Sequence, residues 1–354
     1  KSFDTVLEYG KPRGKSLRVV KNQELLLPTK YENPDGSLNL NQLYAAYSDG
    51  YTLVINEINK YCKPINNLVH NMRQELSHDV KANAYLTPAN QKALSPHYDT
   101  HDVFVLQISG KKHWNFYDDT NFKTPLLNSF QPIFKEGQLT GKKEVTIEAG
   151  DLMYIPRGLP HEAYTSDESS LHLTIGVYPT QHVDLLSKAV QSLAQNDLDL
   201  RKALPVGFLN FTEAEKKKFI EELSSKFSDK LEKILDPNNL ENTLFTVSDE
   251  FRNKVQPKSD GHFAQLDKIQ NLTLETKLTK RENMPTKVIQ VGNFSRIIFP
   301  GNVIKGPAQI TSVFEYIAQS EEFFIKNIPK VNDDNKLKLA KRLIRGGLLK
   351  TVEI

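Results

Sequence analysis

The chain has 354 residues, of which 38% are apolar and 25% charged, and its formal net charge is +3. This composition is typical of a globular protein with two or three domains, and it indicates no fibrous, disordered or membrane class. Cys62 is the only cysteine, which excludes a disulfide framework and a cysteine-based zinc site within one chain. We therefore expect a cytoplasmic protein.

Two further features bear on location. No apolar run approaches the length of about 18 residues that a membrane helix needs, so we expect no membrane contact. The sequence lacks a signal-peptide pattern at Lys1. A chain that begins without Met can have been trimmed, so a removed leader stays open.

The first part of the chain is predicted to be a segment that wraps around the following β domain and leads into it. Residues 1–40 mix turn-forming residues with short apolar runs, which predicts loops and short strands. Helices are expected at residues 38–47 and 63–77, with a strand at residues 51–55 between them.

From residue 82 to residue 179, short β-rich runs alternate with turn signals and show almost no helical periodicity. This pattern is typical of an all-β sandwich or barrel. Residues 118–141 are an exception, because the segment is long and lacks a regular pattern. We expect it to be an insertion that faces the substrate.

A metal site is indicated within this β region. His97 and Asp99 are two residues apart, so on an extended strand both side chains project to the same face. His161 follows a short apolar strand and a turn that begin at Gly150. Two His and one carboxylate form a facial triad, which leaves coordination positions open for a co-substrate and dioxygen, as in non-haem Fe(II) oxygenases.

The surroundings of this triad predict an anion site. Lys112 shares a strand face with Trp114 and Phe116, so its ammonium points into an aromatic interior. A buried ammonium needs an anionic partner, and a dicarboxylate co-substrate would supply one. Asn83 and Tyr85 also share a face, and their amide and phenol are suited to hydrogen-bonding a carboxylate.

Four segments of this region carry a resemblance to a known family: NAYLTP, SPHYDTHDVFVLQISGKKHW, GDLMYIPRGLPHEA and LHLTIGVYP. They resemble the JmjC-type Fe(II)/2-oxoglutarate oxygenases of the ribosomal oxygenase group, of bacterial type, which hydroxylate residues of ribosomal proteins. The resemblance covers roughly residues 51–179. It implies a mainly β core, a double-stranded β-helix of the cupin or jelly-roll kind.

The same resemblance assigns roles to individual residues. It implies that His97, Asp99 and His161 bind Fe(II), with dioxygen as the oxidant. It implies that Lys112 contacts the C5 carboxylate of 2-oxoglutarate, with supporting hydrogen bonds from Asn83 and Tyr85. No catalytic residue is implied beyond the metal centre.

One position departs from the family pattern. Related sequences have a Ser late in the last core strand that helps to bind the co-substrate, and the aligned residue here is Gly176. Thr174 lies nearby on the same strand face, and we expect it to contact the co-substrate instead.

The implied function is hydroxylation of a protein side chain, Arg, His or Asn, in a ribosomal protein. A peptide or a small metabolite is the alternative substrate. From a different class, the chain could be a non-catalytic cupin that binds RNA or the ribosome, and a cupin that has lost its metal is a further alternative.

After residue 179 the pattern changes to helix. Apolar residues recur at helical spacing in residues 183–195, and Thr212 with Glu215 forms a capping box before a second apolar stripe that Asp236 and Pro237 end. A third helix is expected at residues 240–255. The resemblance implies that this helical region, residues 181–258, forms a homodimer. The alternative is that its apolar stripes pack on the barrel.

The last part, residues 259–354, has a winged-helix-like α+β order. Strands are expected at residues 287–291 and 295–299, and helices at residues 309–320 and 335–345. From Gly261 onward there are 15 Lys and Arg against 9 Asp and Glu. Such a basic domain is typical of nucleic acid or ribosome contact. The alternative is that the basic residues form the solvated face of the final helix.

The remaining histidines show no ligand-like spacing and are expected to be structural or surface residues, with His172 a candidate outer partner of a metal-bound His. They are His70, His78, His101, His172, His182 and His262. The sequence thus predicts a catalytic domain at residues 1–180, followed by the helical and winged-helix-like domains.

Overall fold

The computed structural model describes the chain except for residues 1, 120–133, 135–137, 256–259, 283 and 353–354. The chain divides into two compact units, Lys1–Pro179 and Thr180–Ile354. Most of the predicted insertion at residues 118–141 lies outside the described residues. Within the described part of the chain, no helix is both long and apolar enough to cross a membrane.

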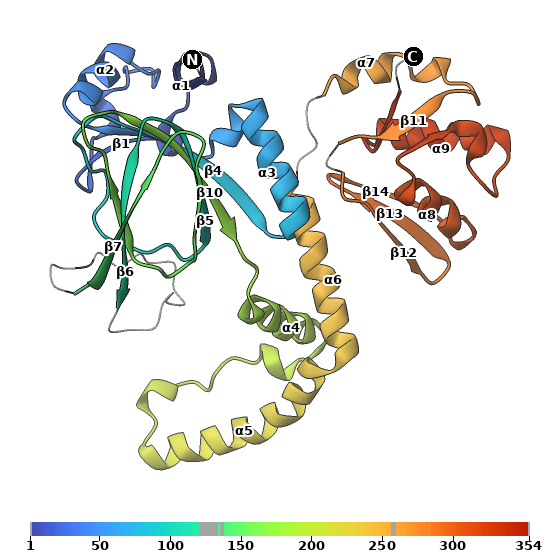
Figure 1. The fold of residues 1–354 in the computed structure, drawn as a ribbon. Helices are drawn as coiled ribbons and strands as arrows, with labels where there is room; N and C mark the ends of the chain where they lie inside the picture. The colour runs from blue at the N-terminus through green and yellow to red at the C-terminus, as the bar shows by residue number, and fades with distance from the viewer. Residues whose placement is uncertain (1, 120–133, 135–137, 256–259, 283, 353–354) are drawn as a thin grey trace. The chain divides into compact units, whose positions relative to one another are not determined.

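The first unit begins with elements that extend and cover a sheet (Figure 1). They are α1 (Ser2–Thr5), β1 (Leu17–Lys21), β2 (Glu24–Leu25), α2 (Leu40–Ser48), β3 (Thr52–Ile55) and α3 (Lys63–Leu76). Strand β1 pairs with β2 and β3, and β3 pairs with β4, all antiparallel. The predicted wrapping segment is therefore hydrogen-bonded into the main sheet.

The core of this unit is two antiparallel sheets. Its strands are β4 (Asp79–Thr87), β5 (Asp102–Ser109), β6 (Lys112–Asp119), β7 (Thr140–Ile147), β8 (Leu152–Ile155), β9 (His161–Tyr164) and β10 (Ser170–Tyr178). One sheet has the order β2-β1-β3-β4-β10-β5-β8, and the other has the order β7-β6-β9. Val105 and Ile155 of the first sheet share an apolar cluster with Trp114 and Ile147 of the second, so the sheets face each other. The predicted mainly β, cupin-like core is confirmed.

Side chains alternate along β4 and β10, so one face of these strands is apolar and packs in the core, and the other face is polar. Val80, Ala82 and Ala84 pack in the large core with residues of the N-terminal segment and α3. Asn83 and Tyr85 therefore project to the opposite face, toward the second sheet. This parity places polar side chains inside the barrel.

The second unit starts with three helices, α4 (His182–Asn196), α5 (Glu213–Leu235) and α6 (Pro237–Lys254). The predicted capping box is present at the start of α5, where the backbone N–H of Glu215 donates to Thr212 Oγ1 and that of Thr212 donates to Glu215 Oε2. Helix α6 begins earlier than predicted, because Asp236 accepts two backbone N–H groups and Pro237 fits the first helical turn.

The rest of this unit is α+β and has its own core. Its elements are α7 (His262–Asp267), β11 (Lys277–Lys280), β12 (Lys287–Val291), β13 (Phe294–Phe299), β14 (Asn302–Pro307), α8 (Thr311–Gln319), β15 (Glu322–Phe324), α9 (Asp333–Arg345) and β16 (Leu349–Thr351). They form two three-stranded sheets, β15-β11-β16 and β12-β13-β14. The winged-helix assignment stays a prediction.

Candidate active site

The three residues predicted to bind a metal are brought together inside the barrel. One ligand atom from each of His97, Asp99 and His161 lies within 4.8 Å of the other two. Asp99 Oδ2 is 3.8 Å from His161 Nε2. Contrary to the sequence prediction, His97 and Asp99 lie in the connection between β4 and β5 and not on a regular strand. Two backbone hydrogen bonds of 3.0 and 2.7 Å between His97 and His161 hold this connection against β9.

Both imidazoles of this triad are oriented for metal binding. His97 Nδ1 lies 2.8 Å from the carbonyl oxygen of Ser95, and His161 Nδ1 lies 2.9 Å from that of Leu159. Since a carbonyl only accepts, each Nδ1 carries the proton and each Nε2 keeps its lone pair. This hydrogen bond to an outer carbonyl is what metal-bound histidines ordinarily have.

The electrostatics of His161 agree with that arrangement. Burial, with the nearby His97 as the second cause, lowers the pKa of His161 to about 4. The ring is therefore neutral near pH 7, as a ligand must be. Two imidazoles and one carboxylate suit Fe(II), and a set of three protein ligands leaves coordination positions open.

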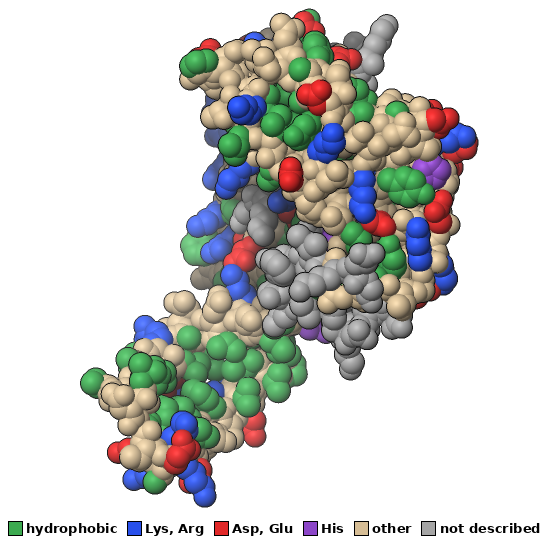
Figure 2. Space-filling view, turned by 90° about the vertical axis from the view of Figure 1, so that its left-hand side faces the viewer, with side chains coloured by type: hydrophobic (Ala, Val, Ile, Leu, Met, Phe, Trp, Pro, Cys, Tyr) green, Lys and Arg blue, Asp and Glu red, His purple; other side chains and the backbone are tan. Residues whose placement is uncertain are grey.

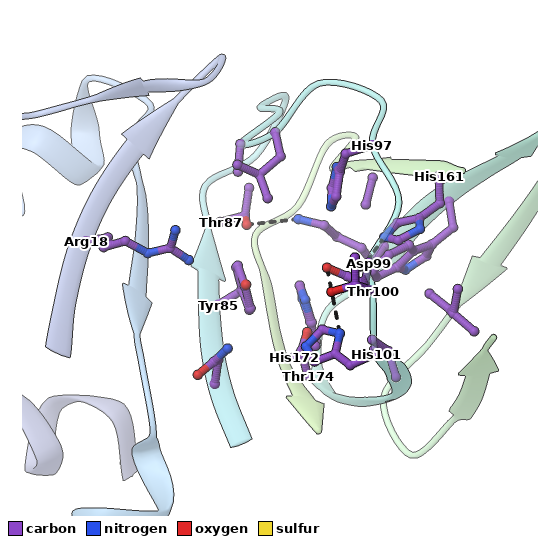
Figure 3. A pocket seen from close by; sticks show the side chains of 18 of the residues that line it. Arg18, Tyr85, Thr87, His97, Asp99, Thr100, His101, His161, His172 and Thr174 are labelled. Atoms are coloured by element: carbon purple, nitrogen blue, oxygen red, sulfur yellow. Dashed lines mark hydrogen bonds and ion pairs between the residues drawn. The ribbon is translucent and has the colours of Figure 1, made fainter. Parts of the chain in front are cut away.

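Lys112 has the inward orientation that strand parity predicted. Its side chain is buried, and its Nζ donates a hydrogen bond of 2.9 Å to Thr87 Oγ1 (Figure 3). Burial lowers the pKa of Lys112 to about 7. Among the described residues, no carboxylate lies within ion-pair distance of this ammonium, whereas the exposed neighbour Lys111 pairs with Glu148 at 2.9 Å.

The other predicted co-substrate residues line the same cavity, whose volume is about 480 Å³. Asn83 and Thr174 are direct cross-strand partners on β4 and β10. Tyr85 stacks on His172, with ring centroids 4.9 Å apart and an interplanar angle of 1°. Asn83 Oδ1 accepts the backbone N–H of Glu57 at 2.9 Å, which leaves its NH₂ group for the cavity.

The departure at Gly176 has a steric explanation. A Cβ at this position would lie 2.8 Å from two ring atoms of His101 and 3.2 Å from Tyr178. His101 lines the cavity and packs on Tyr178, with ring centroids 4.3 Å apart. Its Nδ1 is 4.0 Å from Asp99 Oδ1. His101, expected to be a lone structural histidine, therefore occupies the space that a Ser would need.

Sequence reasoning missed other residues of the cavity. It predicted His172 as an outer partner of a metal-bound His, a role that the carbonyls of Ser95 and Leu159 take instead. Arg18 reaches the cavity from β1, in the segment that carried no functional signal (Figure 3). Thr87 lies at the end of the NAYLT run, and its hydroxyl is the partner of Lys112. His172 lies within the cavity wall, stacked on Tyr85, and its Nδ1 has no hydrogen-bond partner among the described residues. Cross-strand register, which a single sequence does not reveal, brings these groups together.

Comparisons with known proteins agree with this geometry. Residues 58–185 match the JmjC domain family. The NO66 protein of Drosophila grimshawi, described as a bifunctional lysine-specific demethylase and histidyl-hydroxylase, is 35% identical over 182 residues, which cover 49% of this chain and 25% of that protein. Ribosomal oxygenase 1 of Gallus gallus is 31% identical over 222 residues, which cover 59% of this chain and 36% of that protein. The chain thus spans 25% and 36% of the length of these two relatives.

A solved structure supports the fold. The structure of ycfD from E. coli superposes with a TM-score of 0.53 at 17% identity, covering 97% of this chain and 89% of that one. At this identity the likeness concerns the fold alone. The matched domain and the superposed fold lead to one conclusion: residues 58–185 form a JmjC domain, in a chain that is similar to NO66 and Ribosomal oxygenase 1 over about half of its length.

Proposed function

We propose that the chain is an Fe(II)- and 2-oxoglutarate-dependent oxygenase that hydroxylates a protein side chain. One observation carries the proposal: the triad of His97, Asp99 and His161 shares a cavity with the buried Lys112. A metal site with open positions and an anion site are the two parts that this chemistry requires. The alternative of a metal-free cupin gives no reason for both parts in one cavity.

The bound Fe(II) would support a reaction in which dioxygen gives one atom to a C–H bond and one to 2-oxoglutarate, which leaves as succinate and carbon dioxide. The residues of the chain bind and orient the reactants. Lys112 and Thr87 hold the C5 carboxylate by charge and hydrogen bonding. Tyr85 and Thr174 line the same cavity and would contact the co-substrate there.

Asn83 lines another part of the cavity than Thr87 does. It is four residues from Thr87 along β4, which is roughly 13 Å at the usual rise of a strand. Asn83 is therefore too far along the strand to share a carboxylate with Thr87. Its NH₂ group is left for the cavity, because its Oδ1 accepts the backbone N–H of Glu57.

The proposed substrate is a side chain of a ribosomal protein. The support is the name of one relative, Ribosomal oxygenase 1, and the histidyl-hydroxylase activity in the name of the other. Arg, His and Asn are the candidate residues. A peptide or a small metabolite is the alternative substrate.

Mass spectrometry tests this function directly. Ribosomal proteins and peptides incubated with the protein, Fe(II) and 2-oxoglutarate should gain the mass of one oxygen atom. The Asp99→Ala variant should produce neither this gain nor succinate, because one arm of the triad is missing. Equal activity of the Asp99→Ala variant would refute the metal assignment.

We also propose that α4, α5 and α6 form a homodimer interface. Apolar side chains gather over α4 and α5 in the lower part of Figure 2. The exposed set includes Val183, Leu186, Val190, Ile220, Phe227, Leu231, Leu235 and Leu244. A continuous apolar surface of this kind is costly in water unless another surface covers it.

Nucleic acid contact by the basic C-terminal part has weaker support than the dimer. Lys336 pairs with Asp333 at 3.0 Å and Lys338 with Asp334 at 2.5 Å, so both lysines are partly neutralised within α9. These pairs favour a solvated helix face. The division of the second unit into helical and winged-helix-like domains likewise remains a proposal.

A further inference from the structure

The positions of two proposed metal ligands are not fixed by a regular strand. His97 and Asp99 lie on the connection between β4 and β5, and residues 88–99 of this connection are here called the ligand segment. The ligand segment runs beside β9, with isolated antiparallel bridges to it at Lys92 and at His97. The spacing between the ligand segment and β9 therefore sets the spacing between the side chains that would share a metal ion.

An ion pair joins the ligand segment to β9. Lys92 Nζ donates to Glu162 Oε2, and the two side chains are 37% and 10% exposed. Glu162 alternates along β9 with His161 and Ala163, which both line the cavity. Glu162 therefore projects to the other face of the sheet, so the ion pair lies outside the cavity and touches neither the metal nor the co-substrate.

The carboxylate of Glu162 is also fastened to β6. Asn115 is its direct cross-strand partner, and Asn115 Nδ2 donates to Glu162 Oε1 at 3.0 Å. The hydroxyl of Tyr117 donates to the same oxygen at 2.7 Å. One oxygen of the carboxylate is thus held by β6, and the other is held by Lys92. Glu162 connects the ligand segment to two strands at once.

The burial of Glu162 makes this ion pair different from one on the surface. An exposed pair contributes little to stability, as expected for Lys111 and Glu148, whose side chains are 49% and 62% exposed. Glu162 is largely withdrawn from water, so losing Lys92 would leave a buried carboxylate with neutral donors only. Such an unpaired charge is costly, and the ligand segment would shift to relieve it.

We propose that Lys92 and Glu162 are positioning residues for the metal site, whose ion pair holds the ligand segment at the spacing that metal binding needs. This inference rests on the proposed function, because that function requires the metal. The two residues act through the backbone: Glu162 follows His161 in the chain, and Lys92 lies on the segment that carries His97 and Asp99. Groups that orient metal ligands typically change metal affinity by about 10- to 100-fold.

Titration of the metal-free full chain with Co(II) tests the proposal without turnover. Co(II) replaces Fe(II), and its visible absorption reports binding to the three ligands. Lys92→Met keeps the apolar stem and removes the charge, and Glu162→Gln keeps an acceptor for Asn115 and Tyr117. Each variant should bind Co(II) about tenfold more weakly or worse, and Lys92→Arg should restore most of the affinity.

Two controls separate positioning from a general loss of structure. Lys111→Met removes the exposed ion pair with Glu148, which does not involve the ligand segment, and should leave the Co(II) affinity unchanged. Calorimetry then measures 2-oxoglutarate binding to the Co(II)-saturated proteins. This affinity should be the same in Lys92→Met as in the unsubstituted chain, because Lys112 and Thr87 contact each other and not the ion pair.

The outcomes distinguish this inference from the function on which it rests. If the unsubstituted chain does not bind one Co(II), the proposed function itself fails. If Lys92→Met and Glu162→Gln bind Co(II) as tightly as the unsubstituted chain, the ion pair serves the fold alone and the inference is wrong. Equal losses of Co(II) and 2-oxoglutarate affinity would also overturn it, since a loosened barrel weakens both. Glu162→Gln carries the test if Lys92→Met does not fold.

Discussion

Lys112 connects the parity of one strand with the chemistry of the site. Its neighbour Lys111 points outward to Glu148, whereas Lys112 is buried beside Thr87. Burial lowers the pKa of Lys112 from 10.5 to about 7. The free pocket therefore holds this side chain partly neutral at pH 7, although a bound carboxylate requires the charged form.

We predict that 2-oxoglutarate binding takes up a proton above pH 7. The lowered pKa applies to the free protein, and an adjacent carboxylate raises it again. The affinity should be highest below pH 7 and fall by up to about tenfold per pH unit above it. Anaerobic calorimetry at pH 8, in buffers with different ionisation enthalpies, measures the uptake.

Two variants check the source of that proton. Lys112→Arg stays charged throughout, so its binding should take up no proton, and the exposed control Lys111→Arg should behave like the unsubstituted protein. Proton uptake that persists in Lys112→Arg would assign it to another group. The same lowered pKa also means that the unliganded fold gains stability as the pH rises from about 7 toward 10.5.

Gly176 and His101 should behave as a matched pair. Gly176→Ser should destabilise the fold by about 1 to 3 kcal/mol, because the new Cβ would overlap the His101 ring. His101→Ala removes that ring. The double variant should therefore lose less free energy of unfolding than the two single variants lose together. Denaturant unfolding of all four proteins measures the coupling, and strictly additive losses would rule the steric explanation out.

The sequence predicts these residues unequally for a physical reason. Lys112 was found because spacing along a strand fixes which face a side chain takes. His97 and Asp99 were found through residue type and the resemblance of their motif, since the strand assumed for their spacing is absent. Arg18 and His101 were missed because their places in the cavity depend on residues far away in the sequence, Tyr85 and Gly176, and on the register between strands. Spacing along the chain carries no information about that register.

Among the helices and strands, the helices with a clear apolar periodicity or a capping box were predicted best. The apolar stripe and capping box of α5, and the amphipathic pattern of α3, matched helices within about two residues. The short strands β11, β15 and β16 were missed. Strands of three or four residues carry too little periodicity to be recognised, and their stability comes from the core that they cover.

We predict that the exposed stripe of α5 holds two chains together. Ile220→Asp combined with Leu231→Asp should convert the dimer to monomer at micromolar concentration, because both side chains are more than half exposed in the single chain. Light scattering measures the mass. Ser225→Asp, an exposed position away from the stripe, is the control and should leave the dimer intact.

A different result would change the assignment of this surface. If the unsubstituted chain is monomeric at the same concentration, the stripe is not a self-association surface. The apolar side chains of α4 and α5 would then need another partner. The helices themselves should fold in either case, since α4, α5 and α6 pack on one another.

At the scale of the whole molecule, the chain combines a unit that contains the JmjC domain and the proposed active site with a second unit of unassigned role. The motifs that carry the resemblance lie in the first unit, so sequence reasoning assigned chemistry only there. For the second unit it predicted a dimer, from apolar stripes and the resemblance, and nucleic acid contact, from the charge. The last part has 15 basic against 9 acidic residues, which indicated nucleic acid contact, but two of its lysines, Lys336 and Lys338, form ion pairs within α9. Composition alone does not show which charges are already paired.

One cavity of this chain should hold Fe(II) and 2-oxoglutarate together. Anaerobic titration of the protein with Fe(II) and 2-oxoglutarate tests it, through the visible absorption that arises when a 2-oxo acid binds Fe(II) in a site of this kind. We predict that the absorption saturates at one Fe(II) per chain, is absent in Asp99→Ala and requires much more 2-oxoglutarate in Lys112→Ala, while Lys111→Ala behaves normally. Saturation that is the same in Asp99→Ala, or the absence of any absorption in the unsubstituted protein, would contradict the account.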